Sequence, residues 1–139
     1  MGLPKRGCPV LHGSSYDAQW GESATNVVLD RHSGVTAIFT GGSRAALGAL
    51  KALRDRGLSV PSDMSLVGLL GPDWLDVTNP PLTRYVLPPA EMSTMTARLL
   101  LERLQHPRGA VPAEPNVMRF EGRLVVPDST APPRTHELS

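Results

Sequence analysis

The sequence is poor in cysteine and in aromatic residues, and it has no long apolar run. Cys8 is the single cysteine among 139 residues, which excludes an internal disulfide and a cysteine-based metal site. No apolar stretch approaches the length that a membrane-spanning helix needs. The first ten residues carry charge but no apolar core of a secretory signal. We therefore expect a cytoplasmic location and no contact with a membrane.

An excess of charge of one sign is also missing. The sequence has fourteen basic and thirteen acidic residues, which gives a formal net charge of +1. Such a balance provides no electrostatic footprint for nucleic acid. The four histidines show no spacing typical of metal ligands. The sequence thus predicts no DNA binding by this chain itself, no metal site and no cofactor.

The best-defined stretch predicts a βαβ unit. The apolar run at 35–39 suits a buried strand, and the glycine pair that follows it suits a tight turn. Ser43 is expected to cap a helix over 44–56, and Gly57 stands where a helix favours a left-handed residue. A second buried strand is predicted at 65–67. A strand, a helix and a strand in succession imply two parallel strands joined by a right-handed crossover.

Weaker patterns flank this unit. They predict a short strand at 9–12, a helix at 22–30 with Trp20 just ahead of it, a third parallel strand at 84–87, a helix at 90–105 with a broad apolar face, and a hairpin of 117–120 with 123–126. The expected fold is α/β and three-layered, with a mostly parallel sheet and a C-terminal hairpin. One domain should span 9–133, after a disordered start at 1–8 and before a flexible tail at 134–139. The closing stretch PDSTAPPRTHELS, which begins at Pro127, is expected to be frayed.

The glycine-rich turn permits one catalytic hypothesis. GGSRA at 41–45 approximates the G-x-S-x-G nucleophile elbow of serine hydrolases, in the required strand–turn–helix context. A triad in hydrolase order would combine Ser43, Asp73 or Asp76, and His106 or His136. The chain is short for that fold, and helix capping by Ser43 needs no other residue. The same turn matches neither a dinucleotide fingerprint nor a P-loop.

Several blocks together resemble a known family. VTAIFTGGSRAALGALKALRDRGLSVPSDMSLVG, NPPLTRYVLPPAEM, LLLERL and LVVPDSTAPP are similar to the C-terminal part of LacI/GalR-family transcriptional regulators. WGES at 20–23 is similar to the family's W-(T/S)-A-E-S-G. The resemblance covers roughly 9–133. It implies a type I periplasmic-binding-protein-like sensor, in which two α/β subdomains close over a small effector, often a sugar or a purine. It further implies a separate N-terminal helix-turn-helix domain that reads an operator as a dimer.

The resemblance also implies a set of effector-binding residues, namely Trp20, Gly42, Ser43, Leu70 and Leu87. The family has Asn-Asp where this chain has Gly42-Ser43, and an Asp where it has Leu70. Leu87 stands at another position that is polar in the family. Each buried polar partner that is lost weakens ligand binding by roughly 1–3 kcal/mol. A sugar held in the family's usual way is therefore not expected here.

A dimer interface is implied at Leu47, Thr78 and Asn79, although Leu47 could equally pack against the sheet. The predicted function is the effector-binding and dimerisation portion of a LacI/GalR-type regulator, which is not an enzyme. Operator DNA would be reached only through a helix-turn-helix domain that this sequence does not contain. The alternatives are a stand-alone or degenerate sugar- or solute-binding module and the hydrolase built on Ser43.

Overall fold

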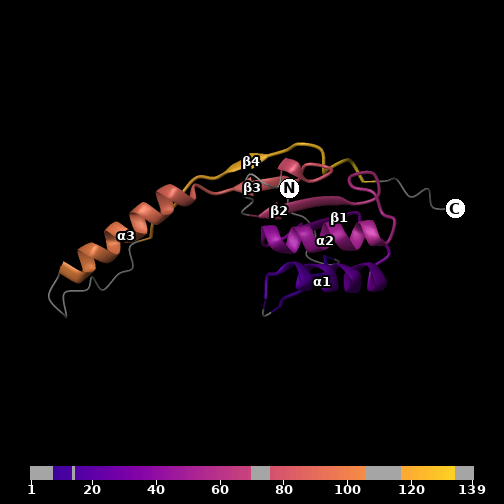
Figure 1. The fold of residues 1–139 in the computed structure, drawn as a ribbon, viewed down its shortest axis with the longest axis horizontal. Helices are drawn as coiled ribbons and strands as arrows, with labels where there is room; N and C mark the ends of the chain where they lie inside the picture. Colours follow the sequence, from indigo (N-terminus) through magenta and orange to yellow (C-terminus); the bar gives the residue numbers. More distant parts are fainter. Residues whose placement is uncertain (1–7, 14, 70–75, 106–116, 134–139) are drawn as a thin grey trace.

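A computed structural model describes residues 8–13, 15–69, 76–105 and 117–133 (Figure 1). The remaining segments are not described. Several predictions fall in those segments, namely the roles of Leu70, Asp73, His106 and His136, the disordered start over 1–7 and the flexible tail at 134–139.

The elements are, in chain order, α1 (Ala18–Arg31), β1 (Ala37–Thr40), α2 (Ser43–Asp55), β2 (Ser65–Leu69), β3 (Thr83–Val86), α3 (Pro89–Gln105) and β4 (Arg123–Val125). The strands form one sheet in the order β1-β2-β3-β4. β1 and β3 each run parallel to β2, and β4 runs antiparallel to β3. The predicted βαβ unit and the third parallel strand are confirmed.

The core lies between α2 and the sheet. Its centre is formed by Ala46, Ala49, Leu66 and Leu82, all fully buried. Leu47 packs against this cluster from the side, together with Ile38, Leu50 and Val60. The alanines of this cluster lie on the inner face of α2, against the sheet.

The C-terminal end of α2 follows the prediction. Gly57 has a φ of 71°, a conformation that costs a residue with a side chain roughly 1–2 kcal/mol. The amide of Leu58 donates to the carbonyl of Leu53 at 2.9 Å, which satisfies one of the last carbonyls of the helix. The chain is thereby turned back toward the start of β2.

α1 lies against α2, and two glycines make the contact possible (Figure 1). A Cβ atom at Gly48 would lie 1.9 Å from the carbonyl oxygen of Ala18. A Cβ atom at Gly21 would lie 2.3 Å from the carbonyl oxygen of Ala45. Both glycines are buried. The backbones of the two helices therefore touch, and no larger residue fits at either position without moving them apart.

The C-terminal hairpin was predicted wrongly. Residues 117–120 form no strand, and β4 pairs instead with β3, where Tyr85 faces Leu124 in the register. The pairing of β4 with β3 is explained by a close contact between Gly122 and Tyr85, which are far apart in the sequence. A Cβ atom there would lie 2.5 Å from the Tyr85 ring, and the Gly122 amide donates to the Tyr85 hydroxyl at 3.2 Å. This contact directs the returning chain onto β3.

Fraying of the stretch from Pro127 was also predicted wrongly for the part that the structure describes. Ser129 is fully buried. Its hydroxyl donates to the Leu66 carbonyl at 2.6 Å and accepts from the Thr83 amide at 2.7 Å, and its carbonyl accepts from the Leu66 amide at 2.9 Å. One residue of the closing stretch thus connects β2 with the start of β3.

Two further expectations need correction. Residues 9–12 lie in a segment without strand pairing, and Pro9 has no amide to contribute to a ladder. α3 has the predicted length, but it extends away from the sheet and none of its residues is buried (Figure 1). In the part of the chain that the structure describes, no helix combines the length and the apolar character needed to cross a membrane.

We predict that Gly48→Ala destabilises the protein, because the added methyl group would overlap the Ala18 carbonyl oxygen. Overpacking of this kind typically costs about 1–3 kcal/mol. The free energy of unfolding from urea denaturation measures the effect. Gly34→Ala is the matched control, since a Cβ atom at Gly34 meets nothing within 4 Å. Equal stability of the two variants would contradict the close helix contact.

Candidate functional site

The candidate site lies at the carboxyl ends of the parallel strands, where ligands of open α/β sheets bind. β1 ends at Thr40, and the turn from Gly41 to Ser43 leads into α2. Thr40 and Gly68 are register partners near the ends of their strands. Leu87 follows the end of β3 and is half-buried. The structure thus brings Gly42, Ser43 and Leu87 to one edge of the sheet.

The cap of α2 differs from the prediction. Gly42, rather than Ser43, is the N-cap residue, and its extended backbone has no side chain to accept from the first-turn amides. Its carbonyl accepts from the Ala46 amide at 3.0 Å. Ser43 is the first helical residue. Glycine can occupy an N-cap nearly as well as serine, which explains the shift of one position.

Tyr16 lies over the glycine turn. A Cβ atom at Gly41 would be 3.9 Å from Cε1 of Tyr16, and one at Gly42 would be 3.9 Å from its Cβ. These are ordinary van der Waals distances, so the side chain packs along the turn while it stays 64% exposed. Its ring centroid lies 6.2 Å from that of Trp20 with a tilt of 56°. An aromatic pair therefore borders the carboxyl edge of the sheet.

The start of α1 fixes this aromatic pair in place. Asp17 is the N-cap, and its carboxylate accepts from the Trp20 amide at 2.8 Å. The Ser15 hydroxyl donates to the same carboxylate. These two hydrogen bonds, with that of Ser15 the stronger, hold the pKa of Asp17 below its ordinary value. The helix begins before Trp20, so the expectation that Trp20 lies ahead of it was wrong.

Tyr16 was missed in the sequence because the start of the helix was placed too late. Asp17 is a strong N-cap residue, and the position before an N-cap often carries an apolar side chain that packs at the helix entrance. Reading Asp17 as the cap would have placed Tyr16 outside the helix and Trp20 within its first turn. It would also have put Gly21 on the face that packs against Ala45.

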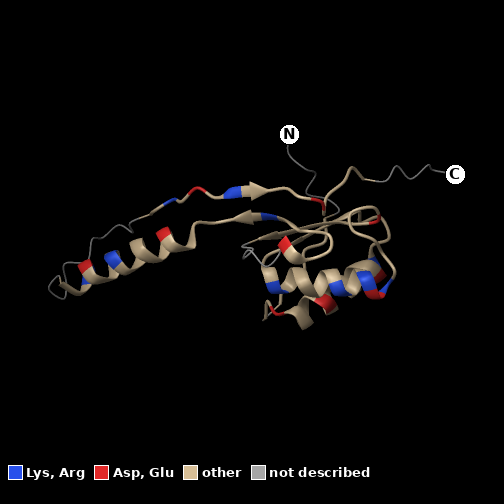
Figure 2. Ribbon diagram, turned by 45° about the horizontal axis from the view of Figure 1, so that its top comes forward, with Lys and Arg blue, Asp and Glu red and all other residues tan. Residues whose placement is uncertain are grey.

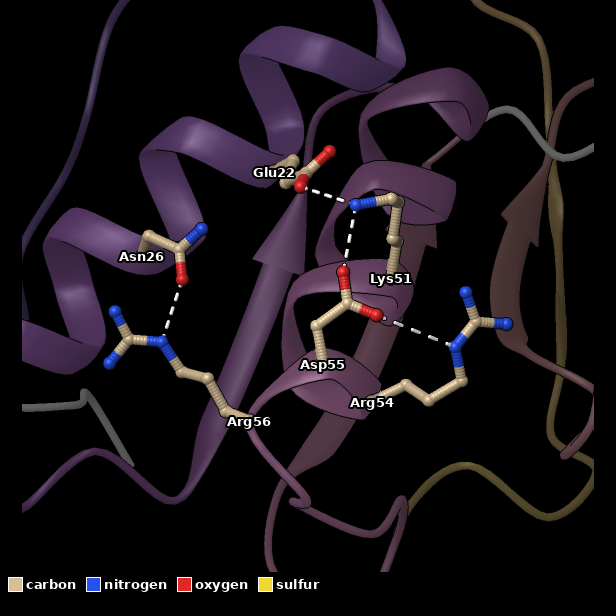
Figure 3. A network of polar contacts seen from close by, with 6 residues as sticks. All are labelled: Glu22, Asn26, Lys51, Arg54, Asp55 and Arg56. Carbon is tan, nitrogen blue, oxygen red and sulfur yellow. Dashed lines mark hydrogen bonds and ion pairs between the residues drawn. The ribbon is translucent and has the colours of Figure 1, made fainter.

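A polar network holds α1 against α2 on the outer surface (Figure 3). The Lys51 ammonium lies 2.5 Å from Glu22 of α1 and 2.8 Å from Asp55 of its own helix. The Arg56 Nε donates to the Asn26 side chain at 2.7 Å. The hydrogen bond from Lys51 lowers the pKa of Asp55. Exposed pairs of this kind each contribute little, so they support a contact that the glycines create.

A cavity of about 670 Å³ lies at the opposite end of the sheet, near the amino ends of the strands. It is lined by Leu50 and Arg54 of α2, by residues 57–60 and by Thr78, Asn79 and Pro80. Two of the three predicted interface residues, Thr78 and Asn79, therefore lie beside α2. Leu47 is not among the lining residues, because it packs against the core one helical turn before Leu50.

One ion pair between a buried arginine and a half-exposed aspartate was not expected from the sequence. The Arg84 side chain is 3% exposed, and it forms two hydrogen bonds to Asp76, at 2.6 and 2.9 Å. The Arg84 Nε has no hydrogen-bond partner within the described part of the chain. Arg84 is the register partner of Gly68 in the pairing of β2 with β3. The pair ties the segment after β2 to β3.

Neither a metal site nor a charged face is seen in the described ranges. No group of three or more His, Cys, Asp or Glu residues there could hold a metal ion. Basic and acidic residues are interspersed along the ribbon (Figure 2). The geometry therefore offers a ligand an aromatic surface beside a glycine turn.

The family model of the periplasmic binding protein-like domain matches residues 5–130. The chain belongs to this family. Its α/β fold with a mostly parallel sheet matches solved sensor domains of LacI-family regulators. The resemblance to the C-terminal part of these regulators is thereby confirmed.

Two named relatives illustrate the similarity. The transcriptional regulator MalR of Streptomyces coelicolor is 36% identical over 122 residues, which cover 88% of this chain and 34% of MalR. Catabolite control protein A of Priestia megaterium is 34% identical over 100 residues, which cover 71% of this chain and 30% of that protein. The chain thus spans about a third of the length of these relatives, which are regulators rather than enzymes.

Solved structures agree. A LacI family regulator from Enterococcus faecium with bound ribose superimposes with a TM-score of 0.71 at 30% identity, over 86% of this chain and 43% of that one. The CelR–cellobiose complex gives 0.73 at 31% identity, over 83% of this chain and 34% of that one. In both cases the family member is much longer than the matched region.

We predict that Asp76→Ala lowers the free energy of unfolding by about 1–3 kcal/mol, because it leaves the buried Arg84 guanidinium without its half-exposed counter-ion. Urea denaturation measures the change. In the double variant Asp76→Ala/Arg84→Met no charge is left unpaired, so much of the stability should return. A double variant no more stable than Asp76→Ala alone would show that the ion pair is not the cause.

Proposed function

We propose that this chain forms one wall of the effector site and part of the dimer interface of a LacI/GalR-type transcriptional regulator. The observation that carries the proposal is the placement of Tyr16 over the Gly41–Ser43 turn, at the carboxyl edge of a parallel sheet. Membership of the periplasmic binding protein-like family supports it.

The effector wall consists of Trp20, Gly42, Ser43 and Leu87, which the resemblance implied, and of Tyr16, which was not predicted. Leu70 completes the predicted set. Leucine and glycine side chains cannot donate or accept hydrogen bonds. We therefore propose that a sugar-like or purine-like effector is recognised here mainly through a ring face, by contact with Tyr16. Aromatic side chains offer a large flat apolar surface for such contact.

Regulation would act through parts that the relatives contain in addition to the matched region. We propose that operator DNA is bound by a separate helix-turn-helix domain in the cytoplasm. The near-neutral charge of this chain fits a sensor and dimerisation role. Effector binding would then change operator affinity by favouring one arrangement of the sensor over another.

No catalytic role is proposed. Of the hypothetical hydrolase triad, only Ser43 and Asp76 fall in the described ranges. Asp76 is engaged with Arg84 through both carboxylate oxygens. A carboxylate held in this way is poorly placed to orient a histidine beside Ser43. The named relatives are regulators, which favours the sensor function over hydrolysis.

For the effector wall, we predict that Tyr16→Ala raises the dissociation constant of a bound effector about tenfold, equivalent to about 1.4 kcal/mol. Ribose, cellobiose and adenine are suitable probes, followed by intrinsic fluorescence or calorimetry. Phe39→Ala is the matched control, because Phe39 is as exposed as Tyr16 but belongs to β1. Binding that is insensitive to Tyr16→Ala, or no binding of any probe, would contradict this role.

For the interface, we predict a dimer in light scattering, and a shift toward monomer in Asn79→Arg. The substitution would add a charge to an exposed residue beside the α2 cavity, where a partner would have to desolvate it. Leu47→Glu is a poorer test, since Leu47 packs against the core and the variant would lose stability. Gly34→Ala serves as control, and a wild-type monomer at high concentration would refute the interface.

A further inference from the structure

The cavity near the amino ends of the strands has the composition of a small-molecule site. Its volume of about 670 Å³ falls within the range of such sites. They are typically lined by apolar side chains, with a few polar groups that orient the ligand. The apolar side chains that line this cavity are Leu50, Leu58, Val60 and Pro80, and the polar ones are Arg54, Ser59, Thr78 and Asn79. The effector wall lies at the other end of the sheet, so this would be a separate site.

The floor of the cavity is continuous with the packed core. Leu50 belongs to α2 and Val60 to the connection that leads to β2. Both side chains are half-buried, and both pack against the core cluster. The core therefore already holds the floor in place. An apolar ligand group could be buried on it without the cost of ordering these side chains.

Hydrogen bonds also hold both sides of the rim in shape. On one side, the Ser59 amide donates to the Asp63 carboxylate at 2.7 Å, and the Asp63 amide donates to the Ser59 carbonyl at 2.8 Å. On the other side, the Thr78 hydroxyl donates to the Pro80 carbonyl at 2.9 Å. A ligand would thus enter a cavity whose walls are already formed, which favours binding.

Arg54 determines which charge the ligand should carry. It is the only charged side chain among the described residues that line the cavity. Its Nε lies 3.7 Å from the Asp55 carboxylate, which is itself bound by Lys51 at 2.8 Å. Figure 3 shows the two terminal nitrogens of Arg54 on the side away from Asp55. These nitrogens are donors in a planar group that matches a carboxylate, so the cavity favours an organic anion.

The surroundings of Arg54 are compatible with an anion. The last carbonyls of α2 would repel one if they were free, but those of Leu53 and Arg54 accept from the amides of Leu58 and Gly57, each at 2.9 Å. Within the described ranges, neither the Ser59 hydroxyl nor the Asn79 side-chain amide forms a hydrogen bond. Both groups can donate to a ligand oxygen.

We infer that this cavity is a second small-molecule site, which takes a compact organic carboxylate. The apolar body of the ligand lies on Leu50 and Val60, and its carboxylate is bound by Arg54. The consequence for regulation rests on the proposed function, because Thr78 and Asn79 line the cavity and belong to the proposed dimer interface. The ligand and a second copy of this chain would compete for one surface, so the carboxylate should favour the monomer.

The test uses phenylacetate as the probe and phenylacetamide as its neutral analogue, in an NMR chemical-shift titration of the whole chain. We expect saturable binding of phenylacetate with a millimolar or lower dissociation constant, and shifts concentrated in 57–60 and 78–79. Phenylacetamide should bind at least about tenfold more weakly, because it lacks the charge that Arg54 binds. Arg54→Gln should weaken phenylacetate binding by the same factor. Arg44→Gln is the matched control, since Arg44 is an exposed arginine at the other end of the same helix.

Three results would overturn the second site. They are the absence of saturable phenylacetate binding, equal binding by the wild type and Arg54→Gln, and binding that is lost in Tyr16→Ala but retained in Arg54→Gln. The last result would place the ligand at the effector wall.

Light scattering tests the link to the dimer. Phenylacetate should lower the dimer fraction of the wild type but not that of Arg54→Gln. A dimer that persists at saturating phenylacetate would contradict the competition. A wild-type chain that is monomeric without the probe would refute the proposed interface alone, and the titration would still decide whether the second site exists.

Discussion

The backbone contact between α1 and α2 is the constraint on which the rest of the structure depends. Gly48 and Gly21 remove the side chains that would hold the two helices apart. α1 then brings Tyr16 and Trp20 to the turn at the end of β1. The position of Tyr16 and Trp20 beside the candidate site thus depends on the absence of side chains at Gly21 and Gly48. The surface ion pairs around Lys51 reinforce this arrangement but could not create it.

The parts that local sequence predicted are those that local chemistry determines. The apolar run of β1 and the left-handed Gly57 each depend on neighbours within one or two turns. Helix boundaries were less certain, because Gly42 and Asp17 compete with other acceptable cap residues nearby. Because the start of α1 was uncertain by a few residues, Tyr16 was not identified as a site residue from the sequence.

The parts that were missed depend on partners far away in the sequence. Ser129 is buried because its hydroxyl meets groups 46 and 63 residues earlier, which no local pattern reports. Gly122 directs β4 onto β3 through a ring 37 residues away. Arg84 would ordinarily be expected in solvent, and its burial is tolerable because Asp76, on the other side of a turn, and the Leu82 carbonyl accept its hydrogen bonds. The family resemblance predicted the fold although these long-range contacts were missed. It did not predict which residues form the candidate site.

The hydrogen bonds of Ser129 have a consequence for how the molecule is synthesised. β2 and β3 are complete by residue 86, yet the side chain that connects them arrives more than forty residues later, after the chain has travelled out along α3 and back. Closing so long a loop is entropically slow. On the ribosome, the backbone groups of β2 and β3 that pair with Ser129 would therefore stay without this partner until the closing stretch had emerged. A nascent chain in this state is exposed to chaperones and proteases until that stretch has emerged.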